Sequence, residues 1–186
     1  MKKIILASTS PRRRELLSLS GLSFEIDAPD CDERIEGSVS PEEYVKELSL
    51  RKCRAAASLH PDALVIGADT IVCYRDRILG KPADAKEAFR MLTELSGQIH
   101  EVFTGVTVTD TAGARTETFC ERTEVEFYNL TAEEIREYVN TKEPLDKAGA
   151  YGIQGRGALL VRRISGDYCN VVGLPLARLV RILKTF

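Results

Sequence analysis

The stretch that decides the fold reads Ala-Leu-Val-Ile-Gly-Ala-Asp-Thr-Ile-Val-Cys, at residues 63–73. It is apolar over nearly its whole length and too rich in β-branched residues for a helix, which favours a buried strand. Asp69 and Thr70 are its two polar members. We therefore expect a buried strand that is broken at these two residues.

Strand and helix patterns alternate on both sides of this stretch. Apolar or alternating segments predict strands at residues 3–7, 22–28, 78–79, 102–109 and 116–128, the last two forming a hairpin across Ala112-Gly113. Capping residues predict helices that begin at Ser10, at Ser40 with an end near Leu59, near Ala83 with an end before Gly97, at Thr131 and at Pro175. This mixture predicts an α/β fold. Because no change in composition marks a boundary, we expect one domain over residues 1–186, with a cleft.

The composition is that of an ordinary soluble globular chain, with 44% of its 186 residues hydrophobic and 29% charged. Its 26 basic and 28 acidic residues give a net charge of −2, which provides no general attraction to nucleic acid. The absence of tryptophan and of interleaved aromatic and basic residues disfavours single-stranded nucleic acid as well. No apolar run is long enough to span a membrane. We therefore expect neither nucleic acid nor a membrane as a partner.

Several kinds of catalytic and metal site are disfavoured by what the sequence lacks. The five cysteines are far apart and form no C-x-x-C pair, so neither a disulfide framework nor a zinc ribbon is predicted, and we expect a cytoplasmic protein. Only two histidines are present, and no C-x5-R loop, H-E-x-x-H or G-x-S-x-G motif occurs. Cysteine or serine nucleophiles are therefore disfavoured.

Asp69 is the strongest single candidate for a functional residue. An ionised carboxylate within an apolar strand costs several kcal/mol unless a cation, a metal ion or hydrogen-bond donors meet it. Lys81, in Gly80-Lys81-Pro82, is able to supply that cation or a phosphate contact, because Pro82 fixes the start of the next helix beside it. The alternative is that Asp69 forms a purely structural salt bridge.

Cationic side chains at two helices are candidates for binding an anion. Arg12, Arg13 and Arg14 fall in the first turn of the helix that Ser10 caps, where the helix dipole disfavours cations and favours a bound phosphate. Lys52 falls on the apolar stripe of the helix after Ser40, which comprises positions 45, 48, 52, 55 and 59. The alternatives are three solvated arginines and a lysine whose stem packs while its ammonium reaches water.

An acidic segment and a glycine-rich segment are further candidates for a functional site. Asp32 and Glu33, in an acidic loop, are able to hold a hard divalent ion together with Asp69, although such loops are commonly just solvated. The glycine-rich residues 146–157 suit close approach of the backbone to a ligand but match no dinucleotide or Walker motif. Cations with carboxylates are the groups needed for metal-assisted attack of water on a phosphoanhydride.

Five ordered motifs together resemble the Maf family of nucleoside triphosphate pyrophosphatases, nearly from end to end of the chain. They are Ala7-Ser-Thr-Ser-Pro-Arg-Arg-Arg-Glu-Leu-Leu17, Gly67-Ala-Asp-Thr70, Gly80-Lys-Pro82, residues 146–155 and Gly166-Asp-Tyr-Cys-Asn-Val-Val-Gly-Leu-Pro175. Cys169 departs mildly from the serine, tyrosine or histidine that the family pattern leads us to expect at this position.

The resemblance implies a fold and a reaction. The fold would be like that of inosine triphosphate pyrophosphatase, an elongated, twisted mixed sheet flanked by helices, with two lobes around a deep cleft. The reaction would be hydrolysis of a nucleoside triphosphate to its monophosphate and pyrophosphate with Mg²⁺ or Mn²⁺. Such folds commonly form homodimers, although the sequence leaves the oligomeric state open. By the same resemblance, the catalytic base would be Asp69, the metal environment Asp69 and Glu33, the triphosphate contacts Ser8, Arg13, Lys52 and Lys81, and the specificity positions Arg12, Thr70 and Gln154.

Gln154 indicates which branch of the family the sequence resembles. The form Ala148-Gly-Ala-Tyr-Gly-Ile-Gln-Gly155 is similar to the branch that acts on dTTP and UTP. An amide offers a donor and an acceptor to a neutral uracil or thymine, whereas a carboxylate near this position would favour cationic 7-methyl-GTP. One alternative is therefore a 7-methyl-GTP pyrophosphatase. A second alternative, also from the resemblance, is a non-catalytic nucleotide-binding regulator of septum formation.

Overall fold

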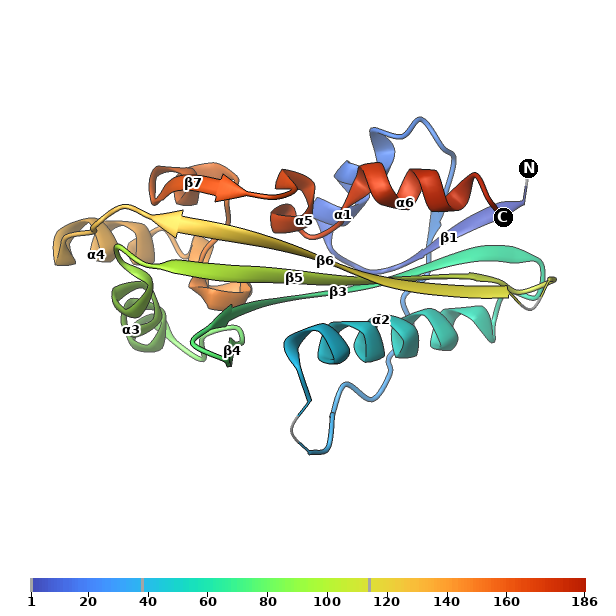
Figure 1. The fold of residues 1–186 in the computed structure, drawn as a ribbon, viewed down its shortest axis with the longest axis horizontal. Helices are drawn as coiled ribbons and strands as arrows, with labels where there is room; N and C mark the ends of the chain where they lie inside the picture. Colours follow the sequence, from blue (N-terminus) through green and yellow to red (C-terminus); the bar gives the residue numbers. More distant parts are fainter. Residues whose placement is uncertain (1, 38, 114) are drawn as a thin grey trace. The chain divides into compact units, whose positions relative to one another are not determined.

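The structure, a computed structural model, describes residues 2–37, 39–113 and 115–186. Over these residues, seven strands form a mixed sheet in the order β2-β1-β3-β5-β6-β7, with β4 paired to β3 (Figure 1). β1 runs parallel to β2 and β3, whereas β4 is antiparallel to β3 and β7 is antiparallel to β6. The strands are β1 (Lys3–Ala7), β2 (Glu25–Ile26), β3 (Ala63–Tyr74), β4 (Arg77–Leu79), β5 (Ile99–Asp110), β6 (Arg115–Phe127) and β7 (Val161–Ser165).

Helices flank this sheet, which confirms the predicted α/β class with a mixed sheet. The α-helices are α1 (Pro11–Ser18), α2 (Pro41–Ala57), α3 (Ala85–Leu95), α4 (Ala132–Asn140), α5 (Tyr168–Val172) and α6 (Leu176–Leu183), and the 3-10 helices are η1 (Glu143–Asp146), η2 (Ala148–Ala150) and η3 (Gly155–Leu159). Ser10 caps α1, and Ser40 and Thr131 form capping boxes at α2 and α4, as the sequence predicts. No helix in the described parts of the chain is both long and apolar enough to cross a bilayer.

Four predictions about local structure are wrong. β3 continues through Asp69 and Thr70 without a break, because other segments provide partners for both side chains. Of residues 22–28, only Glu25 and Ile26 form a strand, at the exposed edge beside β1. Leu59 leaves the predicted apolar stripe and is 59% exposed, because α2 ends at Ala57. Pro82 does not begin α3, which Asp84 caps instead.

The chain divides into two compact units, and β3, β5 and β6 contribute residues to both. Unit 1 consists of Met1–Thr70, Thr104–Glu121 and Gly173–Phe186, and unit 2 consists of Ile71–Phe103 and Arg122–Val172. The single domain and the cleft between two lobes stay predictions. The units are described separately below, because each has its own core.

Two glycines bring α2 of unit 1 into direct contact with the sheet. A Cβ atom at Gly67 of β3 would lie 2.3 Å from the carbonyl oxygen of Ser49, and one at Gly105 of β5 would lie 2.2 Å from that of Val45. Side chains in the interior leave no space of this kind, so only glycine permits the approach. In Figure 1, α2 lies on one side of the unit 1 strands and α6 on the other. The glycines therefore fix the position of α2 on β3 and β5.

Replacing Gly67 by alanine is expected to lower the free energy of unfolding by about 3 kcal/mol, because the new methyl group must displace helix backbone. For a chain of this size the loss corresponds to a fall of about 6–12 °C in Tm. Gly80→Ala is the matched control, because a Cβ there meets no atom within 4 Å. Thermal unfolding followed by circular dichroism gives both values. Equal Tm values for the two variants would contradict the backbone contact.

An aromatic cluster lies in the core of unit 2. His100 is 1% exposed, its Nε2 lies 2.8 Å from the hydroxyl of Tyr151, and its ring packs edge-on against Tyr151 and Phe127. Its Nδ1 has no hydrogen-bond partner among the described residues. Burial lowers the pKa of His100 from 6.5 to about 3. The native state therefore holds this imidazole neutral.

Acid is expected to destabilise the protein through His100. Between pH 6.5 and about 3 the unfolded chain binds a proton that the native imidazole does not, so stability falls as pH falls through this range. The loss from this group is about 2 kcal/mol at pH 5. His100→Gln keeps a hydrogen-bonding group but does not titrate. Urea unfolding at pH 7 and pH 5 should therefore show a smaller acid-induced loss in the variant, and equal losses would contradict the expectation.

Candidate functional site

Asp69 and Glu33 share one ammonium group in unit 1. Lys52 Nζ donates to Asp69 Oδ1 at 2.5 Å and lies 3.1 Å from Glu33 Oε1. The side chains of Asp69 and Lys52 are 12% and 19% exposed, whereas that of Glu33 is 59% exposed. The cation that neutralises Asp69 is thus Lys52, one helix residue before the Cys53 backbone that contacts Gly67. The close approach of α2 to β3 therefore creates this pair.

Arg51 holds the acidic loop against α2. Its NH1 donates to the carbonyl oxygens of Asp32, at 3.1 Å, and Arg34, at 2.8 Å, on either side of Glu33. Its Nε donates to Glu47 on the same helix at 2.7 Å, which restrains the guanidinium. Arg51 therefore positions Glu33 next to Lys52. No sequence motif identified Arg51, because its role depends on where the loop folds back.

Arg13 joins three segments of unit 1. Its Nε donates to the carbonyl oxygen of Gly173 at 2.8 Å, its NH1 to Ser8 Oγ at 3.2 Å and its NH2 to Thr70 Oγ1 at 2.9 Å. These bonds use three of the five N–H donors of the guanidinium. Ser8 is 7% exposed and also accepts from the backbone N–H of Ser10 at 3.3 Å. The side chains of Ser8, Arg13 and Thr70 thus form one network.

Gly173 belongs to this network, although the sequence analysis assigned it no role. Its φ of +129° lies in a region that side chains disfavour, and its carbonyl oxygen also accepts from Thr70 Oγ1 at 3.4 Å. Its place in the fifth family motif was the available signal. Glycine adopts this conformation readily, and the Gly173 carbonyl faces Arg13.

The charges at the two clusters act on one another. Burial lowers the pKa of Arg13, while the negative charges of Asp69 and Glu33 oppose that shift and Arg12 adds to it. Successive strand residues face opposite sides, so Asp69 faces α2 and Thr70 faces Arg13. β1 ends at Ala7, opposite Gly67, and so does not pair with β3 at Asp69. Carboxylates and cations therefore gather where β3 extends past the end of β1.

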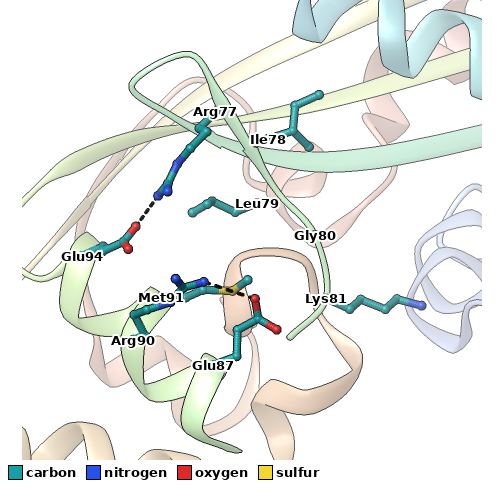
Figure 2. A pocket seen from close by; sticks show the side chains of 9 residues that line it. All are labelled: Arg77, Ile78, Leu79, Gly80, Lys81, Glu87, Arg90, Met91 and Glu94. Carbon is teal, nitrogen blue, oxygen red and sulfur yellow. Dashed lines mark hydrogen bonds and ion pairs between the residues drawn. The ribbon is translucent and has the colours of Figure 1, made fainter. Parts of the chain in front are cut away.

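Lys81 and Gln154 belong to unit 2. Lys81 is exposed after β4 and lines a shallow pocket with Arg77, Glu87 and Glu94, and Figure 2 shows its side chain directed away from these three. Gln154 is half-buried and immediately precedes η3. Arg12 is half-buried in the first turn of α1. Unit 1 thus holds two neighbouring clusters, one of Glu33, Lys52 and Asp69 and one of Ser8, Arg13 and Thr70, together with Arg12. Unit 2 holds Lys81 and Gln154.

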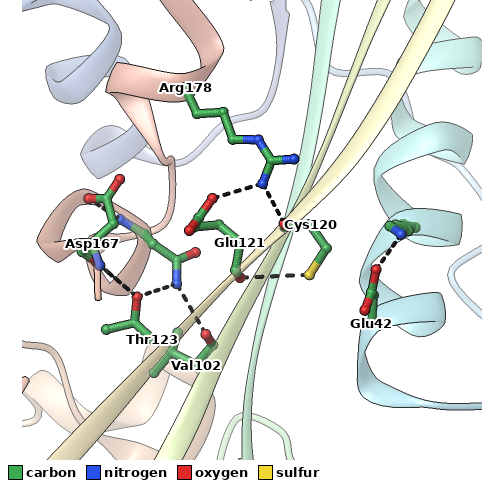
Figure 3. A network of polar contacts seen from close by, with 9 residues as sticks. Glu42, Val102, Cys120, Glu121, Thr123, Asp167 and Arg178 are labelled. Carbon is green, nitrogen blue, oxygen red and sulfur yellow. Dashed lines mark hydrogen bonds and ion pairs between the residues drawn. The ribbon is translucent and has the colours of Figure 1, made fainter. Parts of the chain in front are cut away.

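Asp167 organises the start of the fifth motif within unit 2. Its Oδ1 accepts from the backbone N–H groups of Cys169, at 2.6 Å, and Asn170, at 3.2 Å, and its own N–H donates to Thr123 Oγ1 at 3.0 Å (Figure 3). Asn170 also donates to Thr123 Oγ1, at 2.9 Å. Cys169 takes part through its backbone, and burial raises the pKa of its thiol. A change of side chain at 169 therefore leaves this turn intact.

The carboxylates of unit 1 are the candidate ligands for the divalent cation that the resemblance implies. No group of three or more His, Cys, Asp or Glu side chains forms a cage within residues 2–37, 39–113 and 115–186. Mg²⁺, however, is commonly bound by one or two carboxylates together with substrate phosphates and water. Asp69 and Glu33, which both contact Lys52, supply carboxylates of this kind. The residues fit a metal ion that arrives with a triphosphate.

Comparison with known proteins supports the resemblance. The family described as Maf-like protein matches residues 3–186. A dTTP/UTP pyrophosphatase of Bacillus cytotoxicus is 57% identical, and one of Bacillus cereus is 56% identical, each covering 100% of this chain and 96% of the relative. The Ham1 protein of Staphylococcus aureus aligns with a TM-score of 0.49 and 16% identity, over 69% of this chain and 73% of that one. By its family match and its close relatives, the chain belongs to the Maf family.

Proposed function

We propose that this protein hydrolyses dTTP and UTP to the nucleoside monophosphate and pyrophosphate. The observation that carries the proposal is the shared contact of Asp69 and Glu33 with Lys52, in the electrostatic neighbourhood of Arg13. The relatives of 56–57% identity bear the name of this activity. The cluster contains the carboxylates and cations that attack of water on a phosphoanhydride needs.

Asp69 is the proposed catalytic base. Its carboxylate would orient a water molecule and accept a proton from it as the water oxygen attacks the α-phosphorus. The bond between the α-phosphorus and the bridging oxygen to the β-phosphate then breaks, and pyrophosphate leaves. The low exposure of Asp69 keeps its carboxylate in one orientation. The hydrogen bond from Lys52 Nζ to Asp69 Oδ1 holds one of its two oxygens in place before substrate binds.

Cationic and hydroxyl side chains would hold the triphosphate. Arg13 is fixed by three hydrogen bonds, and Lys52 is able to move its ammonium from Asp69 to a phosphate oxygen. Ser8 and Lys81 are the remaining proposed contacts. Positive charges already in place stabilise the charge that develops on the leaving pyrophosphate. A divalent cation, Mg²⁺ or Mn²⁺, would be held by Asp69 and Glu33 and would polarise the phosphoryl oxygens.

Arg12, Thr70 and Gln154 are the proposed specificity residues. The Gln154 amide presents both a donor and an acceptor to the neutral edge of uracil or thymine. Thr70 already accepts from Arg13 and exchanges a hydrogen bond of 2.9 Å with Thr104, so its hydroxyl is held in one place. A neutral amide at position 154 favours dTTP and UTP over cationic 7-methyl-GTP.

Purified protein incubated with a panel of nucleoside triphosphates and Mg²⁺ or Mn²⁺ tests the proposal. Separate assays for phosphate and pyrophosphate identify the bond that breaks. The expected result is one pyrophosphate per monophosphate, with dTTP and UTP as the best substrates. Preference for 7-methyl-GTP would overturn the substrate class. Nucleotide binding without turnover would support the non-catalytic regulator instead.

We also propose that the protein acts in the cytoplasm. Its five cysteines are all free thiols, which is the usual state in a reducing compartment. The homodimer stays a prediction, which analytical ultracentrifugation would test.

A further inference from the structure

The residues around Gln154 form a tight loop in unit 2. A Cβ atom at Gly157 would lie 2.0 Å from the carbonyl oxygen of Gly152, so the two ends of segment 152–157 touch. Gly155 has a φ of +65°, which turns the chain immediately after Gln154. Gln154 itself is extended, with φ −86° and ψ 166°. It therefore stands near the middle of a loop whose ends are closed.

Two side chains from outside the loop hold both of its ends. The hydroxyl of Tyr138, on α4, accepts from the backbone N–H of Gly152 at 3.1 Å and donates to Glu143 Oε1 at 2.9 Å. Glu143, at the start of η1, accepts from the backbone N–H of Gly157 at 3.1 Å through Oε1 and from that of Arg156 at 3.1 Å through Oε2. The Tyr138–Glu143 pair thus fixes the backbone before and after Gln154.

The pair is built to stay in place. Tyr138 is 4% exposed, and burial raises the pKa of its phenol, so the hydroxyl remains neutral and both donates and accepts. Lys147 supports the same structure, because its Nζ donates to the carbonyl oxygen of Glu143 at 2.6 Å and its stem packs where a Gly152 Cβ would stand. The loop is therefore held by a buried tyrosine together with the half-buried Glu143 and Lys147.

The rigidity of this loop matters for selecting the base of the nucleotide. Uracil presents an N–H group beside a carbonyl, and guanine presents the same pair on its corresponding edge. An amide that bonds one of them is able to bond the other, so hydrogen bonding alone does not separate UTP from GTP. What separates them is size, because the edge of a purine lies further from the sugar. Gln154 selects a pyrimidine only if its amide is held at a fixed distance from the sugar of the bound nucleotide.

We infer that Tyr138 and Glu143 are positioning residues that fix the distance of the Gln154 amide from the sugar of the nucleotide. They thereby make the site prefer uracil and thymine over guanine. The inference rests on the proposed function, since it assigns the specificity of that reaction. Neither residue would contact the reacting atoms. They act by holding the backbone on which Gln154 is mounted.

Tyr138→Phe tests the inference, because it keeps the ring and removes the hydroxyl that Gly152 and Glu143 share. The ratio of kcat/KM for UTP to kcat/KM for GTP should fall about tenfold, as UTP loses its positioned contact and the loosened loop admits guanine. Tyr128→Phe is the matched control, because Tyr128 is 53% exposed, and it should leave the ratio unchanged. A loop with a purely structural role would lower both kcat/KM values together and leave the ratio within twofold, which would overturn the inference.

Glu143→Gln gives a second measurement should Tyr138→Phe fail to fold by circular dichroism. The amide replaces one of the two acceptor oxygens by a donor, so either Arg156 or Gly157 loses its partner. The same fall in the UTP to GTP ratio is expected, and an unchanged ratio contradicts the inference. Absence of pyrophosphate release from any pyrimidine triphosphate by the native chain is a different result, because it overturns the proposed function itself.

Discussion

An Asp69→Asn variant is expected to release pyrophosphate from UTP and dTTP about 10³-fold more slowly than the native chain, with nucleotide binding largely intact. The amide has nearly the same shape as the carboxylate but accepts no proton from water. It also removes the ion pair of 2.5 Å with Lys52, so the ammonium, which still lies 3.1 Å from Glu33 Oε1, is more available to phosphate. Initial rates give kcat, and isothermal titration calorimetry gives the Kd of each nucleotide.

The control for this change is Asp62→Asn, which removes an exposed carboxylate just before the same strand. It should leave kcat unchanged. Native rates in the Asp69 variant would refute its assignment as the base. A variant that loses nucleotide binding and turnover together would show that Asp69 organises the phosphate site and is not the base.

Arg13→Lys is expected to lower kcat/KM for UTP about 10²-fold even though the positive charge is retained. A lysine ammonium is a point charge on a flexible stem and does not reproduce the planar fork that contacts Ser8, Thr70 and Gly173. The phosphate contact would therefore lose its fixed direction. Steady-state kinetics with UTP measures the loss.

Arg14→Lys is the matched control, because Arg14 follows directly in the same helical turn but is exposed. Its kcat/KM should stay within about twofold of the native value. If the two variants behave alike, charge alone matters at this helix start, and the hydrogen-bonded network of Arg13 has no part in binding.

Local features of the fold were predictable because they depend on residues close in the chain. Ser40 and Thr131 each exchange hydrogen bonds with a glutamate three residues on, so the capping boxes are visible in the sequence. The strand predicted at residues 78–79 is part of β4, which a tight turn at Arg75 and Asp76, both with positive φ, joins to β3. The prediction of a strand at residues 22–28 was wrong because only two of these residues pair with β1, and a local pattern does not reveal such pairing.

The candidate site was predictable by residue type but not by pairing. A carboxylate in an apolar strand was expected to meet a cation, a metal ion or hydrogen-bond donors. Lys81 was the cation suggested, whereas the structure pairs Asp69 with Lys52. That choice depends on how α2 sits on β3, which is set by contacts of Gly67 with Ser49 and Cys53. Arg51 was not predicted for the same reason. Its acceptors are backbone carbonyls 17 and 19 residues away in the chain.

The three internal bonds of Arg13 also bear on the thermodynamics of nucleotide recognition. A free arginine side chain loses about 2 kcal/mol of rotamer entropy when a ligand immobilises it, but Arg13 is already immobilised when the chain folds. Its association with a polyanion should therefore carry little conformational penalty. Pyrophosphate, as the departing product, would meet the same rigid cation, so its release requires breaking contacts and gains no side-chain disorder in return.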